Sequence, residues 1–344
     1  EGEFISKESG EEMLAIAEAK DFEFVDVDNL GVKTNIDDYI ERHIEMVLAL
    51  PYVDIEAIKN KNFKVAYDAV NSVGGIVMPL LLKALGVKDI VELYNEPNGR
   101  FPHNSEPLPE HLSVLCSEVK INKCDVGIAV DPDVDRVAFV DEKGVCFGEE
   151  YTLVAVADFI LQNKKGATVS NLSSSKALKD VTEQHGCEYF ASAVGEVNVV
   201  KMMKEVNAVI GGEGNGGVIL PELHYGRDAL VGVALFLTHL AKSEKTVSSL
   251  QSKYPQYVIS KNKVQLEEGM NVSNIIKRIG EKYANYEQNT IDGLKINFED
   301  YWVHLRTSNT EPIIRIYAES STENTAHSIT NKIKGDIMAI LKEA

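Results

Sequence analysis

The chain has 344 residues, of which 44% are hydrophobic and 26% are charged, and this is the composition of a folded globular protein. Its formal net charge of −18 argues against nucleic acid or an anionic membrane surface as the main partner. The four cysteines show no CxxC spacing, and we find neither a signal peptide nor an apolar run of about twenty residues. We therefore expect reduced thiols, no membrane partner and a cytoplasmic location.

The length predicts two to four domains. Residues 1–45 carry helical signals, over 6–19 and again from Asn35, which we assign as the N-cap of a second helix. From residue 63 onward, short β-branched runs alternate with helical patterns, which is typical of an α/β fold. The predicted strands of this region are 63–67, 87–94, 167–172, 187–191 and 208–210, and its helices are 76–85, 151–162, 176–185, 198–205 and 229–241.

The last segment, from about residue 254, has a different spacing. Strands are predicted at 294–298, 301–305 and 313–318, followed by an amphipathic helix over 323–341. The fold class is therefore α/β, with repeated mixed α/β domains and a C-terminal α+β domain. We place the domain limits at 1–45, 46–165, 166–253 and 254–344.

The most informative stretch is Asp131-Pro132-Asp133-Val134-Asp135-Arg136, between the apolar runs 126–130 and 137–140. These runs predict two strands, with the carboxylates of Asp131, Asp133 and Asp135 in the loop that joins them. Three carboxylates this close repel one another unless a cation neutralises them. Oxygen ligands select a hard cation, Mg²⁺ before Ca²⁺ or Mn²⁺. Arg136 adds a fixed positive group suited to a phosphate oxygen.

Two other readings of this loop compete. A solvated acidic turn has about even odds for an isolated DxDxD pattern. An EF-hand would use Asp131, Asp133, Asp135 and Glu142, but Arg136 stands where its sharp turn needs glycine, and strands flank the loop instead of helices. We reject the EF-hand.

A glycine-rich stretch follows the predicted strand 208–210 and covers 211–217. Such a stretch lets the backbone, at Gly216 for example, approach a ligand closely, and Glu213 and Asn215 are then its hydrogen-bonding side chains. A carboxylate beside an amide suits neighbouring sugar hydroxyls. Arg227, at the start of the next helix, adds a polar group. A flexible linker is the alternative reading.

The stretch 306–315 gathers hydrogen-bond donors around one turn. Its polar side chains are Arg306, Ser308, Asn309, Thr310 and Arg315. A phosphate dianion requires a set of donors of this kind. The alternative is an ordinary hairpin turn with a solvated arginine.

In this order, the three loops resemble those of the α-D-phosphohexomutase family, which includes phosphomannomutases, phosphoglucomutases and phosphoglucosamine mutases. Residues 131–136 are similar to the family's magnesium loop, 212–217 to its sugar loop and 306–315 to its phosphate loop. The resemblance covers nearly the whole chain from residue 63 onward. It implies four domains around a central cleft, and residues 1–45 would be the remnant of the first.

The activity implied by the resemblance is phosphoryl transfer between the 1- and 6-positions of a glucosamine, mannose or glucose phosphate. A phosphoserine enzyme and a hexose 1,6-bisphosphate carry the phosphoryl group, and the bisphosphate also serves as activator. The implied metal is Mg²⁺ on Asp131, Asp133 and Asp135, with Arg136 contacting the phosphoserine. Sugar phosphates would be the partners of a monomer or dimer.

Two departures from the family pattern matter. The family's serine loop, Thr-Ala-Ser-His-Asn-Pro, does not occur in the sequence, so we expect a truncated, proteolysed or deliberately shortened form that does not form the phosphoenzyme. Many members also have histidine where Gly217 stands, and the Gly-Gly version leans the substrate toward glucosamine phosphate. The general acid and base are not assigned.

Two further classes of protein remain open. A haloacid dehalogenase-type phosphatase would use Asp131 as nucleophile, but it needs Thr or Val where Asp135 stands, and it leaves the Arg306 loop without a purpose. A non-catalytic sugar-phosphate-binding protein is allowed because the serine is missing.

Overall fold

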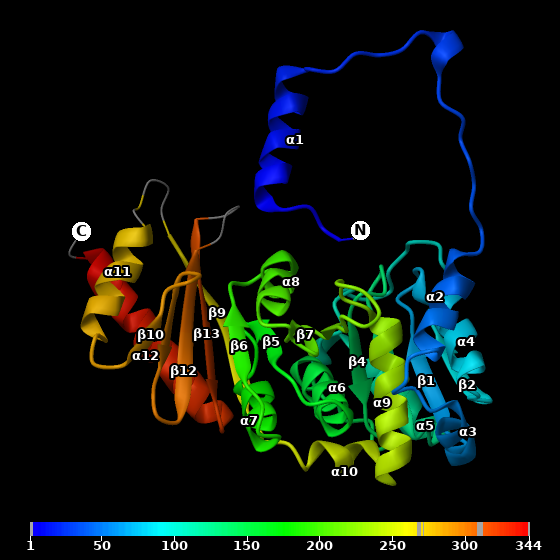
Figure 1. Cartoon of the computed structure of the whole chain (residues 1–344). Helices are drawn as coiled ribbons and strands as arrows, with labels where there is room; N and C mark the ends of the chain where they lie inside the picture. The colour runs from blue at the N-terminus through cyan, green and yellow to red at the C-terminus, as the bar shows by residue number, and fades with distance from the viewer. Residues whose placement is uncertain (1–2, 267–269, 271, 308–311, 343–344) are drawn as a thin grey trace.

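The computed structural model of the chain describes residues 3–266, 270, 272–307 and 312–342. Three sheets lie in a row, and each carries helices of its own (Figure 1). The first two sheets share one topology and the third has another.

The first unit is an α/β layer whose sheet has the order β2-β1-β3-β4. Strands β1, β2 and β3 are parallel, and β4 runs antiparallel at the edge. Its strands are β1 Lys64–Asp68, β2 Asp89–Leu93, β3 Val126–Val130 and β4 Val137–Val140, and its helices are α2 Tyr39–Leu48, α3 Ile55–Lys61, α4 Gly74–Ala84 and α5 Ser113–Asn122. All residues of β3 and β4 are buried, as expected for strands covered on both faces.

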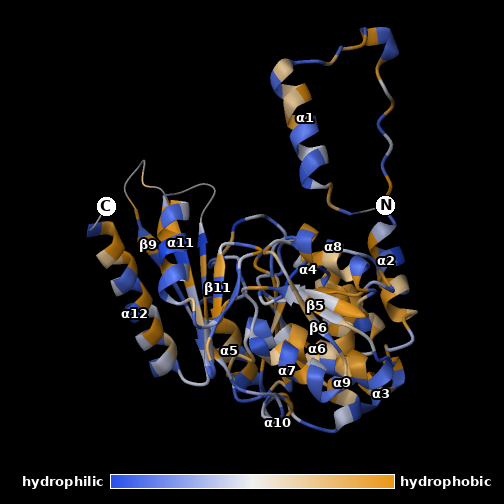
Figure 2. Ribbon diagram, turned by 60° about the vertical axis from the view of Figure 1, so that its left-hand side comes forward, coloured by the Kyte–Doolittle hydropathy of each residue, from blue (hydrophilic) through white to orange (hydrophobic). Residues whose placement is uncertain are grey.

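The second unit repeats this plan in the order β6-β5-β7-β8, with β8 as the antiparallel edge strand. Its strands are β5 Thr168–Asn171, β6 Tyr189–Ser192, β7 Ile210–Glu213 and β8 Gly217–Ile219, and its helices are α6 Glu149–Asn163, α7 Lys176–Gln184, α8 Glu196–Glu205, α9 Ala229–Ser243 and α10 Val247–Gln251. Helices α6 and α9 are apolar nearly all round and almost wholly buried (Figure 2). One hydrophobic core therefore runs through both units.

The third unit is an antiparallel sheet in the order β10-β11-β12-β13-β9 with two helices packed on it. Its strands are β9 Val258–Gln265, β10 Glu287–Asn289, β11 Leu294–Asn297, β12 Tyr301–Thr307 and β13 Ile313–Ser320, and its helices are α11 Val272–Lys282 and α12 Glu323–Lys342. It has a hydrophobic core of its own.

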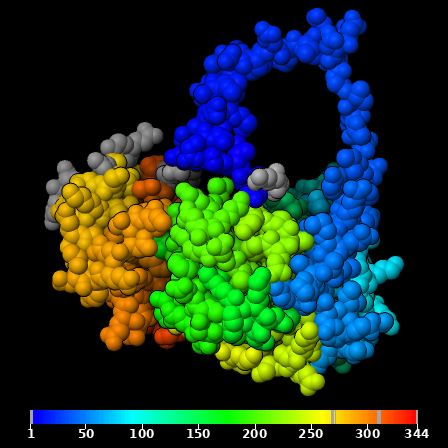
Figure 3. Space-filling model, viewed as in Figure 1, coloured from blue at the N-terminus to red at the C-terminus, as the bar shows by residue number. Residues whose placement is uncertain are grey.

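The segment before α2 projects from this body for much of its length, and its start returns to α8, where Glu3 pairs with Lys204 (Figure 3). Its helix α1, Lys7–Ala19, is capped by the side chain of Ser6 and buries no residue.

The predicted fold class is confirmed, and so is the strand–loop–strand arrangement around the acidic stretch. Some local predictions are wrong. The second helix begins at Tyr39 with Asp38 as N-cap, so Asn35 caps nothing. The strand predicted at 208–210 begins at Ile210 and continues through two glycines to Glu213. The elements α3, α10 and β10 escape prediction because they are too short to show a periodic signal. Strand β9 and helix α11 escape it too, although the apolar residues of α11 recur at helical spacing. No helix in the described ranges is both long and apolar enough to cross a membrane.

Candidate functional site

The repeated topology places one of the predicted loops at the same position in each α/β unit, between the third parallel strand and the antiparallel edge strand. The acidic loop joins β3 to β4, and the glycine-rich turn joins β7 to β8. The two edges also meet, because Arg136 and Gly217 form an antiparallel bridge and the N–H of Val137 donates to the Gly216 carbonyl over 3.0 Å. The backbone itself therefore sets the acidic loop beside the glycine-rich turn.

Glycine is required where this contact is closest. Gly216 has a φ of +94°, and a Cβ there would lie 2.5 Å from the Val137 carbonyl oxygen. The stretch predicted as an open loop over 211–217 is thus a tight hairpin with only three residues outside the strands. A flexible linker is not what the structure shows.

The three aspartates of the acidic loop converge. Their carboxylate oxygens lie within 4.8 Å of one another. Asp131 is fully buried and accepts hydrogen bonds from the Arg136 Nε over 2.6 Å and from two backbone N–H groups of its own loop. Asp133 is exposed.

The acidic loop has two arginine partners for its three carboxylates, with Arg136 Nε 2.6 Å from Asp131 and 3.5 Å from Asp135 Oδ1. Burial, reinforced by the neighbouring Asp131, raises the pKa of Asp135 to about 7. One of its oxygens, Oδ1, is buried and accepts no hydrogen bond from the described residues. Three convergent carboxylates, one of them with a buried oxygen that accepts no hydrogen bond there, fit a hard divalent cation such as Mg²⁺.

Arg227 connects the acidic loop to the glycine hairpin. Its guanidinium contacts Asp135 at 2.5 Å, Glu213 at 2.7 Å and Glu196 at 3.0 Å. Three carboxylates thus hold one side chain, and its use as a substrate ligand stays a prediction.

Glu213 is 5% exposed and has its own partners. Besides Arg227, it accepts a hydrogen bond from the Asn171 Nδ2 over 2.8 Å. Asn215 folds back on the hairpin and accepts from the Gly217 N–H over 3.2 Å. These side chains are therefore fixed in place before any ligand arrives.

The third predicted loop is described only in part, since Ser308, Asn309 and Thr310 lie outside the described residues. Its two arginines flank the turn as cross-strand partners on β12 and β13. Arg306 forms an ion pair with Asp292 at 2.8 Å, and Arg315 is exposed.

All three loops contribute to one cavity of about 300 Å³. The lining side chains include Glu106, Arg136, Glu150, Asn171, Glu213, Asn215, Lys261, Arg306 and Arg315. Four cationic side chains, Arg136, Lys261, Arg306 and Arg315, line this cavity together with the carboxylates of Glu106, Glu150 and Glu213, so donors for an anion gather here although the chain carries a net charge of −18.

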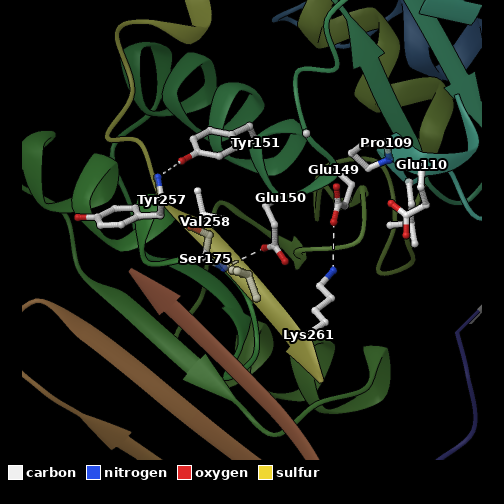
Figure 4. A pocket seen from close by; sticks show the side chains of 12 residues that line it. Pro109, Glu110, Glu149, Glu150, Tyr151, Ser175, Tyr257, Val258 and Lys261 are labelled. Carbon is white, nitrogen blue, oxygen red and sulfur yellow. Dashed lines mark hydrogen bonds and ion pairs between the residues drawn. The ribbon is translucent and has the colours of Figure 1, made fainter. Parts of the chain in front are cut away.

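A neighbouring cavity of about 450 Å³ shares three lining residues with it, Leu108, Glu150 and Lys261 (Figure 4). Lys261 contacts Glu149 at 3.1 Å, and Glu150 accepts a hydrogen bond from the Ser175 N–H over 2.9 Å. Burial raises the pKa of Glu150 to about 8.

Sequence reasoning misses several cavity residues. Ser173 and Ser174 could have been found, because a polar run that follows the predicted strand 167–172 marks the carboxyl end of a parallel sheet, whereas Asn171 lies inside that predicted strand. Glu150 and Lys261 give no signal, because each reads as an ordinary charged residue of a helix or strand.

Fold and site define a multidomain α/β protein in which Arg136, Arg306 and Arg315 line one polar cavity. The acidic loop lies beside it, with Asp133 and Asp135 lining a separate cavity together with Glu196 and Arg227. Residues 37–144, 148–257 and 262–335 match the family descriptions "Phosphoglucomutase/phosphomannomutase" domain II, domain III and C-terminal domain. The chain belongs to this family, the α-D-phosphohexomutases. The match to domain III begins at residue 148, before α6, whereas the sequence predicts the end of the second domain at residue 165. The predicted domain limits stay a prediction.

Named relatives agree with this assignment. The chain is 37% identical to a phosphoglucomutase/phosphomannomutase of Thermococcus kodakarensis over 84% of its own length and 63% of the relative's. It is 32% identical to a probable phosphoglucosamine mutase of Thermococcus gammatolerans over 97% of its length and 72% of the relative's. The chain thus spans somewhat under two thirds of the first of these relatives.

Solved structures share the fold. A phosphoglucomutase/phosphomannomutase family protein from Burkholderia thailandensis superposes with a TM-score of 0.83 at 24% identity, over 97% of this chain and 70% of that one. The N-acetylphosphoglucosamine mutase of Aspergillus fumigatus, in complex with GlcNAc-6P and magnesium, gives 0.60 at 15% identity, over 87% and 68% of the two chains. Another structure of that enzyme contains glucose 1,6-bisphosphate.

Proposed function

We propose that this chain binds a hexose phosphate together with Mg²⁺ and provides the metal, sugar and distal-phosphate sites of a phosphohexomutase. The observation that carries the proposal is the single cavity lined by Arg136, by Glu213 and Asn215, and by Arg306 and Arg315. One small, polar, doubly anionic ligand explains why three sheets contribute to one space.

Each group has a part in this proposal. Arg306 and Arg315 bind the phosphate that is not reacting, and Ser308, Asn309 and Thr310 complete that site. The Glu213 carboxylate accepts hydrogen bonds from the sugar hydroxyls, and the Asn215 amide accepts and donates them. Gly216 lets the hairpin pack closely against Val137. Binding at the remote phosphate then positions the reacting hydroxyl near Arg136, which holds a phosphate oxygen.

The acidic loop is proposed as the metal site. Asp131, Asp133 and Asp135 would hold Mg²⁺, which neutralises charge on a transferring phosphoryl group when bound. The Arg136–Asp131 contact fixes the guanidinium beside that site. The Aspergillus enzyme, crystallised with magnesium, supports this assignment by analogy.

We propose that the preferred substrate is a hexosamine phosphate, in preference to mannose phosphate or glucose phosphate. The Gly217 version of the sugar loop favours this choice. Relatives named as phosphoglucosamine mutases support it too.

Turnover is a separate question from binding. The 344 residues contain no Thr-Ala-Ser-His-Asn-Pro loop. We therefore propose that these residues bind sugar phosphate but do not by themselves pass through a phosphoserine and a hexose 1,6-bisphosphate.

Calorimetry with glucosamine 6-phosphate and with glucose 1,6-bisphosphate, each in the presence of Mg²⁺, tests the proposal. We expect saturable binding that Arg315→Ala weakens about tenfold or more, a loss equal to the roughly 1.5–3 kcal/mol of a charge-assisted hydrogen bond. Lys277→Ala, which removes an exposed charge on α11, is the matched control. No binding, or equal binding by all three proteins, would refute the proposed site. A mutase assay on the same samples decides between binding and turnover.

The phosphatase alternative finds no support in the geometry. Its nucleophile would be Asp131, which is 0% exposed and engaged by Arg136 and by backbone N–H groups.

A further inference from the structure

A second group of side chains that can ligate a metal lies between α2 and α9, outside the cavity of about 300 Å³, and its His224 lines a further cavity with Asp133 and Asp135. It consists of His43, on α2, and of His224 and Asp228, which precede α9. The ligand atoms of these three side chains lie within 4.8 Å of one another. Neither the proposed reaction nor the sequence motifs make use of them.

The geometry is centred on one oxygen. The Nε2 atoms of His43 and His224 lie 2.7 Å and 3.0 Å from Asp228 Oδ2. The other oxygen, Oδ1, accepts hydrogen bonds from the N–H groups of Leu230 and Val231 and so caps α9. The carboxylate is therefore locked by the helix start, and Oδ2 alone faces the two imidazoles.

The surroundings suit an ion. Asp228 is 4% exposed, whereas the two histidine side chains are about one third exposed, at 32% and 37%. A buried carboxylate thus sits under two imidazoles that solvent can reach.

We propose that His43, His224 and Asp228 form a second cation site, selective for a transition metal such as Zn²⁺ or Co²⁺. In a tetrahedral site with bonds of about 2.0–2.1 Å, neighbouring ligand atoms lie roughly 3.4 Å apart, so small side-chain rotations convert the cluster into three ligands. Water takes the fourth position. Imidazole nitrogen favours these ions over Mg²⁺, which the all-oxygen loop prefers.

Binding keeps the protons balanced. In the metal-free cluster, each Nε2 carries the proton that it donates to Asp228. In the metal complex, each Nε2 gives its lone pair to the ion, and the proton resides on Nδ1 or leaves to solvent.

The location of the proposed site predicts an effect on the stability of the chain. The ion would join α2 of the first unit to α9 of the second, two helices that pack together (Figure 1). Asp228 also directly follows Arg227, which forms an ion pair with Asp135 of the acidic loop. We therefore expect occupancy to raise the unfolding temperature, and Mg²⁺ not to replace the transition metal.

The test is a titration of the whole chain with ZnCl₂ and CoCl₂ while Mg²⁺ saturates the acidic loop. We expect one equivalent of zinc, and a visible cobalt spectrum with nitrogen ligation. His43→Gln still donates a hydrogen bond to Asp228 but is a poor ligand, so it separates ligation from folding. This variant and His224→Gln should each lower zinc affinity about tenfold or more.

Two controls make the outcome decisive. His327→Gln removes an exposed histidine of α12 and should leave zinc binding unchanged. Asp133→Asn, in the acidic loop, should do the same. If no stoichiometric zinc binds, or if Asp133→Asn abolishes binding while His43→Gln does not, the proposed site is wrong.

Discussion

At the scale of single residues, the position of a side chain in the sequence does not reveal which residues it forms ion pairs with. The sequence marks Arg227 as a polar residue near the site, and the structure gives it three carboxylate partners from three segments, Asp135, Glu196 and Glu213. Such a pairing depends on which loops the fold brings together, and a local pattern carries no information on that. The clustering of Asp131, Asp133 and Asp135 is easier to predict, because alternate carboxylates between two apolar runs already indicate that their side chains converge in one loop.

Asp133 provides the residue-scale test of the acidic loop. It is the exposed member of the group, so Asp133→Ala should leave the fold intact and weaken Mg²⁺ binding about 10-fold or more. Calorimetric titration with MgCl₂ measures the change. Asp89→Ala removes an exposed carboxylate of β2 and should bind Mg²⁺ like the parent chain. Unchanged affinity in Asp133→Ala would mean that the loop is a solvated turn.

At the scale of elements, the two α/β units show what a sequence pattern can and cannot predict. The buried strands β3 and β4 are predictable because four or five apolar residues in a row leave few alternatives. Strand β7 is predicted too early in the chain, because Gly211 and Gly212 have low strand propensity and tertiary contacts override it. The β-bridge between Arg136 and Gly217 cannot be predicted from local sequence, because it forms only where the edge strands of the two packed units meet.

Gly216 tests this join between the units. Its φ is +94°, and an added Cβ would lie 2.5 Å from the Val137 carbonyl oxygen, so Gly216→Ala should lower the free energy of unfolding by roughly 1–3 kcal/mol. Gly335→Ala is the matched control, because this glycine of α12 has open space around it. There alanine should raise the same free energy by about 0.5–1 kcal/mol. Urea unfolding followed by circular dichroism measures both, and a neutral Gly216→Ala would remove the argument for a tight hairpin.

At the scale of the whole molecule, the C-terminal sheet docks on the second unit through buried polar contacts. The Nδ1 of His304 pairs with Ser173 Oγ over 2.9 Å, and its Nε2 pairs with the Asp292 carbonyl over 2.7 Å. Lys295 donates to the Leu172 carbonyl over 2.8 Å, and Glu319 accepts from the Lys176 N–H. The sequence predicts a separate C-terminal module but not this interface, because its polar residues look like ordinary strand residues.

His304 makes that docking sensitive to pH. Burial lowers the pKa of His304 to about 4, below the roughly 6.5 of an exposed histidine. The unfolded chain therefore binds more protons between these values, so the contribution to stability is full above pH 6.5 and is lost as the pH falls toward 4. The loss should reach on the order of 3 kcal/mol.

Unfolding measured from pH 4 to pH 7 checks this prediction. A His304→Gln variant should show a flatter profile than the parent chain over that window. His327→Gln, which changes an exposed histidine, should not. Identical profiles for His304→Gln and the parent would show that His304 titrates normally in the folded chain.

The most direct test of the shared site is a crystal structure of the chain with Mg²⁺ and a hexose 1,6-bisphosphate. We predict one phosphate bound by Arg306 and Arg315, and sugar hydroxyls near Glu213 and Asn215. The second phosphate should face Arg136 beside Mg²⁺ on the acidic loop. A ligand seated elsewhere, or a metal held away from Asp131, Asp133 and Asp135, would contradict it.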